Sequence, residues 1–212
     1  MTVPLVTVIT PTWQRHELLL ERCIPSVQAQ GYSATEHLIV SDGPDHSLGE
    51  KLSCPWLDGW RNVFYRELPA HDPAPHYGHL ARDYGLELAS GSYVTYCDDD
   101  DALRPMHCNL LAQALDENPD AGFAVSRMVS HGPSGETVIG HGELACGNVG
   151  TPMIMHRREV LDGLPGWDHA GQFEDWDLVL AWINAGVPYV RVDEETSDVW
   201  PSLWRGAGEA AG

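Results

Sequence analysis

Short apolar, β-favouring runs alternate with helical patterns over the first hundred residues. The runs have the composition of strands buried on both faces, and they span 6–10, 37–40, 63–66 and 93–97. Between them, apolar residues recur at helical spacing over 17–30, and 78–89 also has helical character. This alternation predicts an α/β fold with a mostly parallel central sheet, helices on its faces and right-handed crossovers.

Two segments in this half do not fit the alternation. Residues 11–15 follow the first strand and are expected to form a loop, because Pro11 breaks a strand ladder. Residues 48–60 have no clear hydrophobic period and stay unassigned. Apart from these segments, residues 1–101 have the organisation of a nucleotide-binding half.

The second hundred residues combine helices with strands that can pair antiparallel. Helical patterns span 105–117 and 175–185, each with a suitable start or stop residue beside it. Strands are predicted over 123–128, 137–139, 152–156 and 189–192. A turn rich in Gly, Pro and Ser separates the first two of these strands, which is typical of an antiparallel hairpin.

The length of the chain bounds its domain organisation. Its 212 residues are enough for one well-buried core, so we expect a single domain over 1–212. Residues 102–205 would form the second half, which carries the small antiparallel portion of the sheet. Residues 206–212 are expected to be a flexible tail.

The chain is strongly acidic, with 12 Lys and Arg against 31 Asp and Glu and a formal net charge of −19. No basic stripe could neutralise nucleic acid phosphates, and the charge disfavours anionic membrane surfaces. No apolar segment approaches the ~20 residues of a membrane span. The N-terminus enters a strand at once without a basic signal region, so a soluble, cytoplasmic protein is expected. The five cysteines are scattered without a C-x-x-C pair, which indicates neither a disulfide framework nor a zinc ribbon.

Four consecutive aspartates, Asp98 to Asp101, follow the predicted strand at 93–97. Four adjacent carboxylates repel one another, whereas an ordinary acidic turn needs only one or two of them. Hard cations such as Mg²⁺ and Mn²⁺ are commonly held by one or two carboxylates together with the phosphates of a substrate. In open α/β sheets, ligands bind beyond the carboxyl ends of the strands, where this cluster would lie. The sequence therefore favours a divalent metal site over a solvated turn.

Several separated segments resemble the inverting glycosyltransferases of family 2. They are VITPTWQR at 8–15, LIVSDG at 38–43, RDYG followed by ASGSYV at 82–94, DDDD at 98–101 and EDWDL at 174–178. Trp13, Gln14 and Asp83 depart from the Tyr, Asn and Asn that the family usually has. The resemblance extends over roughly residues 5 to 185, and all of its motifs occur in the family's order.

This resemblance implies a GT-A fold that transfers sugar from a nucleoside-diphosphate sugar. Asp100, with Asp98, would hold Mn²⁺ or Mg²⁺ between the two donor phosphates, and Asp42 would accept hydrogen bonds from the nucleobase. The donor-binding residues implied are Pro11, Thr12, Trp13, Asp42, Arg82, Asp98 and Asp99. The acceptor is expected to be a soluble small molecule or a glycoside, and a homo-oligomer remains open.

Asp175 would be the general base, with Glu174 beside it. Inversion needs one carboxylate to take the proton of the acceptor hydroxyl as that oxygen attacks the anomeric carbon. Carboxylates are also favoured in the first turn of any helix by the macrodipole and by capping, so a purely structural role stays open. Arg82 is similarly open between a diphosphate ligand and a salt bridge on the helix.

Other interpretations stay open as well. His71, His76 and His79 lie within nine residues, but no Cys or carboxylate spacing completes a zinc site, so a donor-site loop is favoured. Trp200 and Trp204 could close over the site, stack on a sugar or pack the tail. The competing functions are a sugar-nucleotide-forming nucleotidyltransferase and a catalytically degenerate nucleotide-sugar-binding module.

Overall fold

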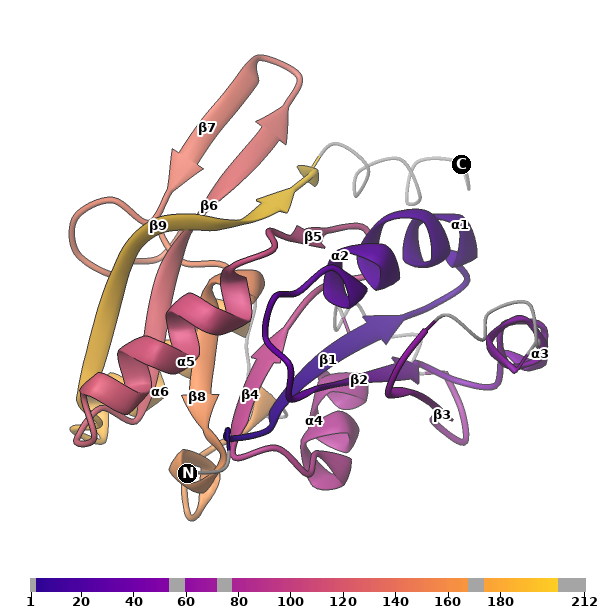
Figure 1. The fold of residues 1–212 in the computed structure, drawn as a ribbon, viewed down its shortest axis with the longest axis horizontal. Coiled ribbons are helices and arrows are strands. Elements are labelled where there is room, and N and C mark those ends of the chain that lie inside the picture. The colour runs from indigo at the N-terminus through magenta and orange to yellow at the C-terminus, as the bar shows by residue number, and fades with distance from the viewer. Residues whose placement is uncertain (1–2, 54–59, 72–77, 168–173, 202–212) are drawn as a thin grey trace.

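A computed structural model describes residues 3–53, 60–71, 78–167 and 174–201. Within these residues, the strands form one nine-stranded sheet in the order β3-β2-β1-β4-β8-β6-β9-β5, with β7 paired to β6 (Figure 1). The strands are β1 (Val6–Thr12), β2 (Thr35–Ser41), β3 (Val63–Glu67), β4 (Tyr93–Tyr96), β5 (Ala102–Leu103), β6 (Phe123–Gly132), β7 (Gly135–Ile139), β8 (Ile154–Arg157) and β9 (Tyr189–Val199).

The pairing divides the sheet into two parts. Strands β3, β2, β1 and β4 are parallel to one another. In the second part, β8 is antiparallel to both β4 and β6, β7 is antiparallel to β6, and β5 is antiparallel to β9. Strand β9 runs parallel to β6. The expected α/β fold, with a parallel first half and an antiparallel portion in the second, is confirmed.

The helices lie against the two parts of the sheet. They are α1 (His16–Leu18), α2 (Ile24–Gln28), α3 (His46–Leu52), α4 (His79–Leu88), α5 (His107–Glu117) and α6 (Glu174–Asn184). Helix α4 packs on β1 and β2, and α5 packs on β6 and β9 (Figure 1). None of the helices in the described part of the chain has both the length and the apolar character of a membrane span.

The loop predicted over 11–15 begins only after Thr12: the prediction is wrong for Pro11 and Thr12, which belong to β1, and confirmed for residues 13–15. Pro11 lies opposite Val40 and Thr12 opposite Ser41 in the parallel pair with β2. The carbonyl of Ile9 accepts from β4, and that of Thr12 from Asp42 after β2. Pro11, two residues after Ile9, therefore faces the β4 side, where pairing has already ended at Ile9. Its missing N–H thus costs no hydrogen bond of the ladder.

The helix predicted over 17–30 is confirmed from His16 to Gln28, but it is not uniform. A π-helical turn, Leu19–Cys23, joins α1 to α2. Such turns are inserted where a side chain must be re-aimed, often at functional sites. Here Arg22 Nη1 donates to the carbonyl O of Asp100 at 2.6 Å, so the turn connects this helix to the acidic run.

A short helix occupies part of the segment that had no clear period. Asp45 begins α3 as its N-cap, and its Oδ1 accepts from the backbone N–H of Leu48 at 3.1 Å. Only Leu48 of this helix is buried. With a single buried residue there is no repeat from which the periodicity could be recognised.

Strand β9 is longer than the predicted strand at 189–192 and continues to Val199. Its middle is charged, but Arg127 on β6 pairs with Asp193 at 2.7 Å and reaches Glu195 at 4.0 Å. Register shifts on either side of Arg127 accommodate this pairing. Cross-strand charge pairs thus stabilise a strand whose hydrophobic pattern has stopped. The far end of β9 also pairs with β5, which is too short to be recognised from its sequence.

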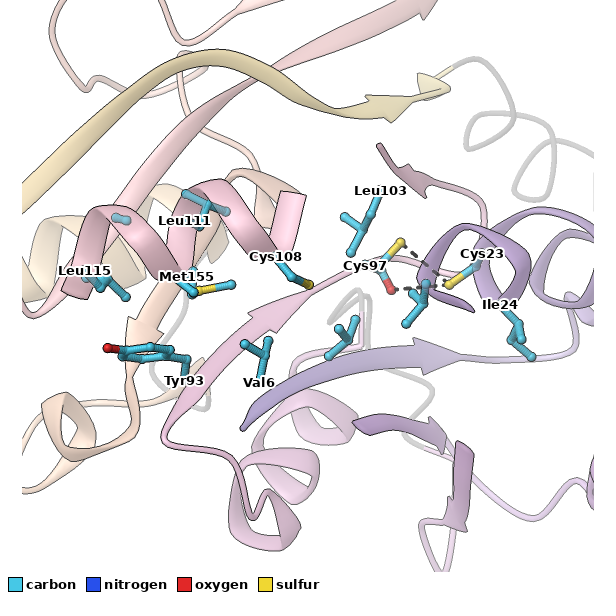
Figure 2. Packing of buried hydrophobic residues seen from close by; sticks show 14 of the residues in the cluster. Val6, Cys23, Ile24, Tyr93, Cys97, Leu103, Cys108, Leu111, Leu115 and Met155 are labelled. Atoms are coloured by element: carbon cyan, nitrogen blue, oxygen red, sulfur yellow. Dashed lines mark hydrogen bonds between the residues drawn. The ribbon is translucent and has the colours of Figure 1, made fainter. Parts of the chain in front are cut away.

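Among the described residues, the buried hydrophobic side chains form three clusters, and one of them contains Cys97, which leads into the acidic run. Figure 2 shows Cys23 from the first helix beside Cys97, which immediately precedes Asp98. Their Sγ atoms are 3.6 Å apart, and both side chains are fully buried. Both are free thiols, and so is Cys146, which differs in being exposed. The turn that carries the aspartates therefore begins from a packed, apolar base.

Candidate functional site

The acidic run lies at the carboxyl end of β4, beside the end of β1, as predicted. Arg15, which follows β1, binds two of its members: Nη2 lies 2.6 Å from Asp99 Oδ1, and Nη1 lies 2.7 Å from Asp100 Oδ2. Thr12 Oγ1 donates to Asp99 Oδ2 at 2.8 Å. Asp99 is therefore a buried anchor of the turn, which leaves Asp98, Asp100 and Asp101 to face a cavity.

Burial shapes the charge of this turn. It raises the pKa of Asp99 to about 7, because loss of solvent outweighs the stabilisation of the carboxylate by Arg15. Burial likewise raises the pKa of Asp100, again against the effect of Arg15. The pKa of Asp101 is raised well above its ordinary range by burial and by the other aspartates. Added positive charge near this turn would therefore stabilise its ionised form.

Arg82, on α4, links the acidic run to the start of α6. Its Nη2 lies 2.6 Å from Asp98 Oδ1, and its Nη1 lies 3.0 Å from Glu174 Oε2. The Arg82 side chain is 3% exposed. Its guanidinium lies 4.7 Å from the ring centroid of Trp167, whose backbone N–H donates to Asp83 Oδ1 at 2.7 Å. Arg82 thus lies between two carboxylates in this structure.

Helix α6 begins with the two carboxylates predicted to be catalytic. Burial raises the pKa of Glu174 to about 7, although Arg82 opposes the shift. It also raises the pKa of Asp175, against the N–H of Trp176, which donates to Asp175 Oδ1 at 2.7 Å. Asp175 thus accepts one backbone N–H of the first helical turn and is also largely buried. Such a raised pKa lies closer to the pKa expected of a general base that works near neutral pH.

A cavity of about 190 Å³ joins the two groups of carboxylates. Asp98, Asp100 and Asp101 line it together with Asp175. The rest of its wall is mostly apolar or small and is formed by Met128, Gly150, Thr151, Pro152, Val199, Trp200 and Pro201. At Gly150 an added Cβ would lie 2.6 Å from the flexible end of Met128, Cε, so a larger residue there would displace this part of the wall.

The residues expected to surround the nucleobase form a second group at the ends of β1 and β2. The rings of Trp13 and His71 are parallel within 3°, with centroids 4.2 Å apart. His71 Nδ1 is 3.0 Å from Asp42 Oδ2. Pro11 packs against Gly78, where an added Cβ would lie 2.8 Å from Pro11 Cβ. Trp13, Asp42 and Pro11 are thus brought to one place, and His71 joins them.

Trp200 lines the cavity, and its ring contacts two other side chains. The Arg22 guanidinium carbon lies 3.9 Å from the ring centroid, and His131 is stacked at 4.7 Å. The Trp200 backbone N–H donates to Asp101 Oδ1 at 3.3 Å. Because Arg22 and His131 already lie against its ring, Trp200 is held in place as part of the cavity wall. Trp204 and His76 lie outside the described residues, as do Gln172 and Phe173, which precede α6.

The donor set fits a divalent cation that is shared with a substrate. Among the described residues, no three His, Cys, Asp or Glu side chains could hold a metal ion by themselves, which includes His71 and His79. Asp98 and Asp100 each use one oxygen for an arginine, and within the described ranges no ion pair engages Asp98 Oδ2 or Asp100 Oδ1. Two hard oxygen ligands at a cavity suit a cation that takes its other ligands from phosphate and water.

Sequence reasoning assigned no role to two residues of this site. Arg15 follows β1 at the same sheet edge as the aspartates, so its position in the sequence could have predicted an ion pair with them. Trp167 lies in a segment without a periodic pattern, and no comparable signal indicates its contact with Arg82.

Comparison with known proteins gives a consistent result. A family model described as "Glycosyl transferase family 2" matches residues 7–165. The putative colanic acid biosynthesis glycosyl transferase WcaA of Escherichia coli (strain K12) is 32% identical over 110 residues, which are 48% of this chain and 34% of that protein.

Two solved structures share the fold. S. aureus TarS 1–349 in complex with UDP-GlcNAc has a TM-score of 0.69 at 21% identity, over 92% of this chain and 58% of that chain. The mannosyltransferase PcManGT from Pyrobaculum calidifontis, in complex with GDP-Man and Mn²⁺, has a TM-score of 0.68 at 16% identity, over 94% of this chain and 57% of that chain. The chain thus spans about a third of WcaA and less than two thirds of either solved chain.

Proposed function

The chain belongs to glycosyl transferase family 2 and has the GT-A fold, and from this premise we propose that it moves a sugar from a nucleoside-diphosphate sugar to an acceptor hydroxyl with inversion at the anomeric carbon. One observation carries the proposal. Asp175, from the second half of the chain, lines the same cavity as Asp98 and Asp100, from the first half. The residues proposed as proton acceptor and as phosphate-side acidic pair thus line one cavity.

The donor would lie across the carboxyl ends of β1, β2 and β4. Its base would stack on Trp13 beside Pro11 and donate to Asp42, and its diphosphate would lie near Asp98 and Asp100. Thr12 and Asp99 would hold the turn in place from behind. Support comes from the solved relatives of the same fold, whose complexes contain UDP-GlcNAc and GDP-Man.

Asp175 would act as the base. As the acceptor oxygen attacks the anomeric carbon, its proton passes to an Asp175 carboxylate oxygen, and the bond to the nucleoside diphosphate breaks on the opposite side. Because the attacking and leaving groups lie on opposite faces, the anomeric configuration inverts. Burial, which raises the pKa of Asp175, makes this carboxylate a stronger proton acceptor than one exposed to water.

Mn²⁺ or Mg²⁺ would be held by Asp100 and Asp98 through the oxygens that their arginines do not use. When bound, such a cation stabilises the charge of the leaving diphosphate. The net charge of −19 supports this proposal, because an anionic donor approaching the site needs local positive charge.

The proposed role of Arg82 is to position carboxylates of the site, and not chiefly to bind phosphate. Its two ion pairs join Asp98, which lines the cavity, to Glu174 at the start of α6. Glu174 is adjacent to Asp175, so this bridge also fixes the start of the helix that presents the base.

The acceptor would be an uncharged hydroxyl compound such as a soluble glycoside. Four carboxylates line the cavity, and its wall contains no Lys, Arg or His among the described residues. An anionic acceptor would be repelled there, whereas the apolar wall from Met128 to Trp200 suits the apolar face of a sugar ring.

Exchange of Asp175 for Asn tests the proposed base. The amide keeps the size of the side chain but cannot take the proton, so kcat should fall by at least about 10²-fold while the Kd for the donor changes little. Asp177→Asn, in the same first helical turn, is the matched control and should be much milder. Turnover would be measured with sugar nucleotides and simple glycosides, and NMR would report the anomeric configuration of the product.

Two results would overturn the assignment. One is normal turnover by Asp175→Asn, and the other is a product that retains the configuration of the donor. Circular dichroism and the melting temperature of the variant separate loss of the base from loss of the helix cap.

A further inference from the structure

The nucleobase end of the proposed donor site contains a histidine to which the reaction assigns no role. The His71 ring lies parallel on Trp13, 4.2 Å between centroids. Its Nδ1 lies 3.0 Å from both the carboxylate Oδ2 and the carbonyl O of Asp42. Because these oxygens only accept, Nδ1 carries the hydrogen and donates it. One flat ring therefore makes both contacts proposed for the base, a stack on Trp13 and an N–H bond to Asp42.

The local backbone is built for this close contact. Gly43 has φ +121°, and a Cβ on it would lie 2.8 Å from His71 N, 2.9 Å from His71 Cβ and 2.9 Å from Trp13 Cζ3. A side chain at position 43 would thus force the two rings away from Asp42. Only a glycine permits both the backbone conformation and the approach.

Asp42 also retains unused hydrogen-bonding capacity. Its Oδ1 is buried and has no hydrogen-bond partner among the described residues. An unsatisfied buried acceptor is costly, so a ligand that supplies a further N–H would gain from it. The histidine therefore satisfies this subsite only in part.

We infer that His71 fills the nucleobase subsite of the free protein and acts as an internal competitor that an incoming nucleotide must displace. The inference rests on the proposed function, which places the base on Trp13 and Asp42. A base that stacks on the Asp42 side of Trp13 needs the volume that the imidazole now fills. The apparent affinity for a nucleotide is lowered by the fraction of molecules in which His71 blocks the subsite.

Calorimetric titration of UDP and GDP, each with Mn²⁺, tests this competition. His71→Ala removes the stack and the hydrogen bond together and should tighten binding of at least one nucleotide by about tenfold. His71→Phe keeps a ring on Trp13 but cannot donate to Asp42, and should give a smaller gain. The control is His46→Ala, because His46 is 89% exposed and faces Glu67 at 3.7 Å. It should leave the Kd unchanged.

Pyrophosphate with Mn²⁺ is the matched ligand control, because it has the phosphates but no base. Its affinity should be the same in the wild type and in His71→Ala. Nucleotide binding that is weaker or unchanged in His71→Ala would overturn the inference, and so would an equal gain for pyrophosphate. If the wild type and all variants bind no nucleotide, the proposed donor itself is wrong, and the inference is withdrawn with it.

Discussion

Two arginines hold the carboxylates of the site, and they do so in different surroundings. Arg15 binds Asp99 and Asp100, two neighbours in one turn, and its side chain is 33% exposed. Arg82 binds Asp98 and Glu174, which belong to different halves of the chain, and its side chain is 3% exposed. Arg15 is thus a local brace at the edge of the site, whereas Arg82 is a buried bridge across it.

This difference in burial indicates how much each arginine contributes to the stability of the folded protein. Because Arg15 is partly exposed, water can replace part of the hydrogen bonding that it gives to the carboxylates. Burial raises the pKa of Asp99 to about 7, so this carboxylate can also take up a proton near neutrality. The Arg82 side chain has much less access to water, at 3% exposed against 33% for Arg15, although its partners Asp98 and Glu174 are themselves 26% and 10% exposed. Similar ion pairs therefore contribute differently to stability because burial sets the cost of losing one partner.

The largest effect is expected for Arg82→Met. The change leaves Asp98 and Glu174 without their shared cation and should lower the free energy of unfolding by about 3–5 kcal/mol. Arg15→Met is the matched comparison and should cost only about 1–2 kcal/mol, because Arg15 is partly solvated. Urea denaturation followed by circular dichroism measures both. Equal losses in the two variants would contradict the distinction between brace and bridge.

A smaller effect on stability, but a clear one on ligands, is expected for Asp100→Ala. Among the described residues, the Asp100 side chain forms its ion pair with Arg15 alone, so its loss should leave the melting temperature close to that of the wild type. The same change removes a proposed ligand of the cation and should abolish the Mn²⁺ dependence of UDP binding. Calorimetry with and without Mn²⁺ checks this. Binding that stays equally tight and equally metal-dependent would remove Asp100 from the metal site.

The smallest effect concerns pH. Burial raises the pKa of Asp99 and of Glu174 to about 7, so between that value and their ordinary pKa near 4 the folded protein binds protons that the unfolded chain does not. Lowering the pH from 8 to 6.5 should therefore stabilise the metal-free protein slightly. Below about 6.5, three buried histidines oppose this gain, because burial lowers the pKa of His37 and His107 to about 3 and that of His156 to about 4.

The melting temperature of the metal-free protein, measured across this pH range, should have its maximum in mildly acidic buffer. A steady rise in melting temperature from pH 6.5 to 8 would show that the two carboxylates are not protonated in the fold. Arg15→Met and Arg82→Met can then show which arginine controls which carboxylate.

The sequence was sufficient where local pattern and sheet geometry act together. Buried runs identified the strands of the parallel half, and the rule that ligands lie beyond their carboxyl ends placed Asp42 and Asp98 at one edge. The aspartate run lies there in the structure, and Asp175 begins a helix as expected. Their assigned roles remain predictions.

Sequence reasoning failed where the outcome depends on distant neighbours. Pro11 stays in β1 because β4 has ended beside it, which no pattern around Pro11 reveals. The ion pair of Arg82 with Glu174 joins residues 92 positions apart. The Trp200 ring contacts Arg22 and His131, which come from different elements. Each of these contacts is fixed by tertiary packing, so local propensity contains no record of it.

The pairing of β9 with β5 has a consequence for how the protein is made. Trp200, just after β9, bonds to Asp101 across 99 residues and completes the wall of the cavity. During synthesis, the parallel strands leave the ribosome long before β9 exists, with their acidic turn still uncovered. We therefore expect a nascent chain arrested before residue 189 to contain the whole aspartate run but no closed site. Assembly of the cavity is then a late and slow event, because contacts of such long range form last.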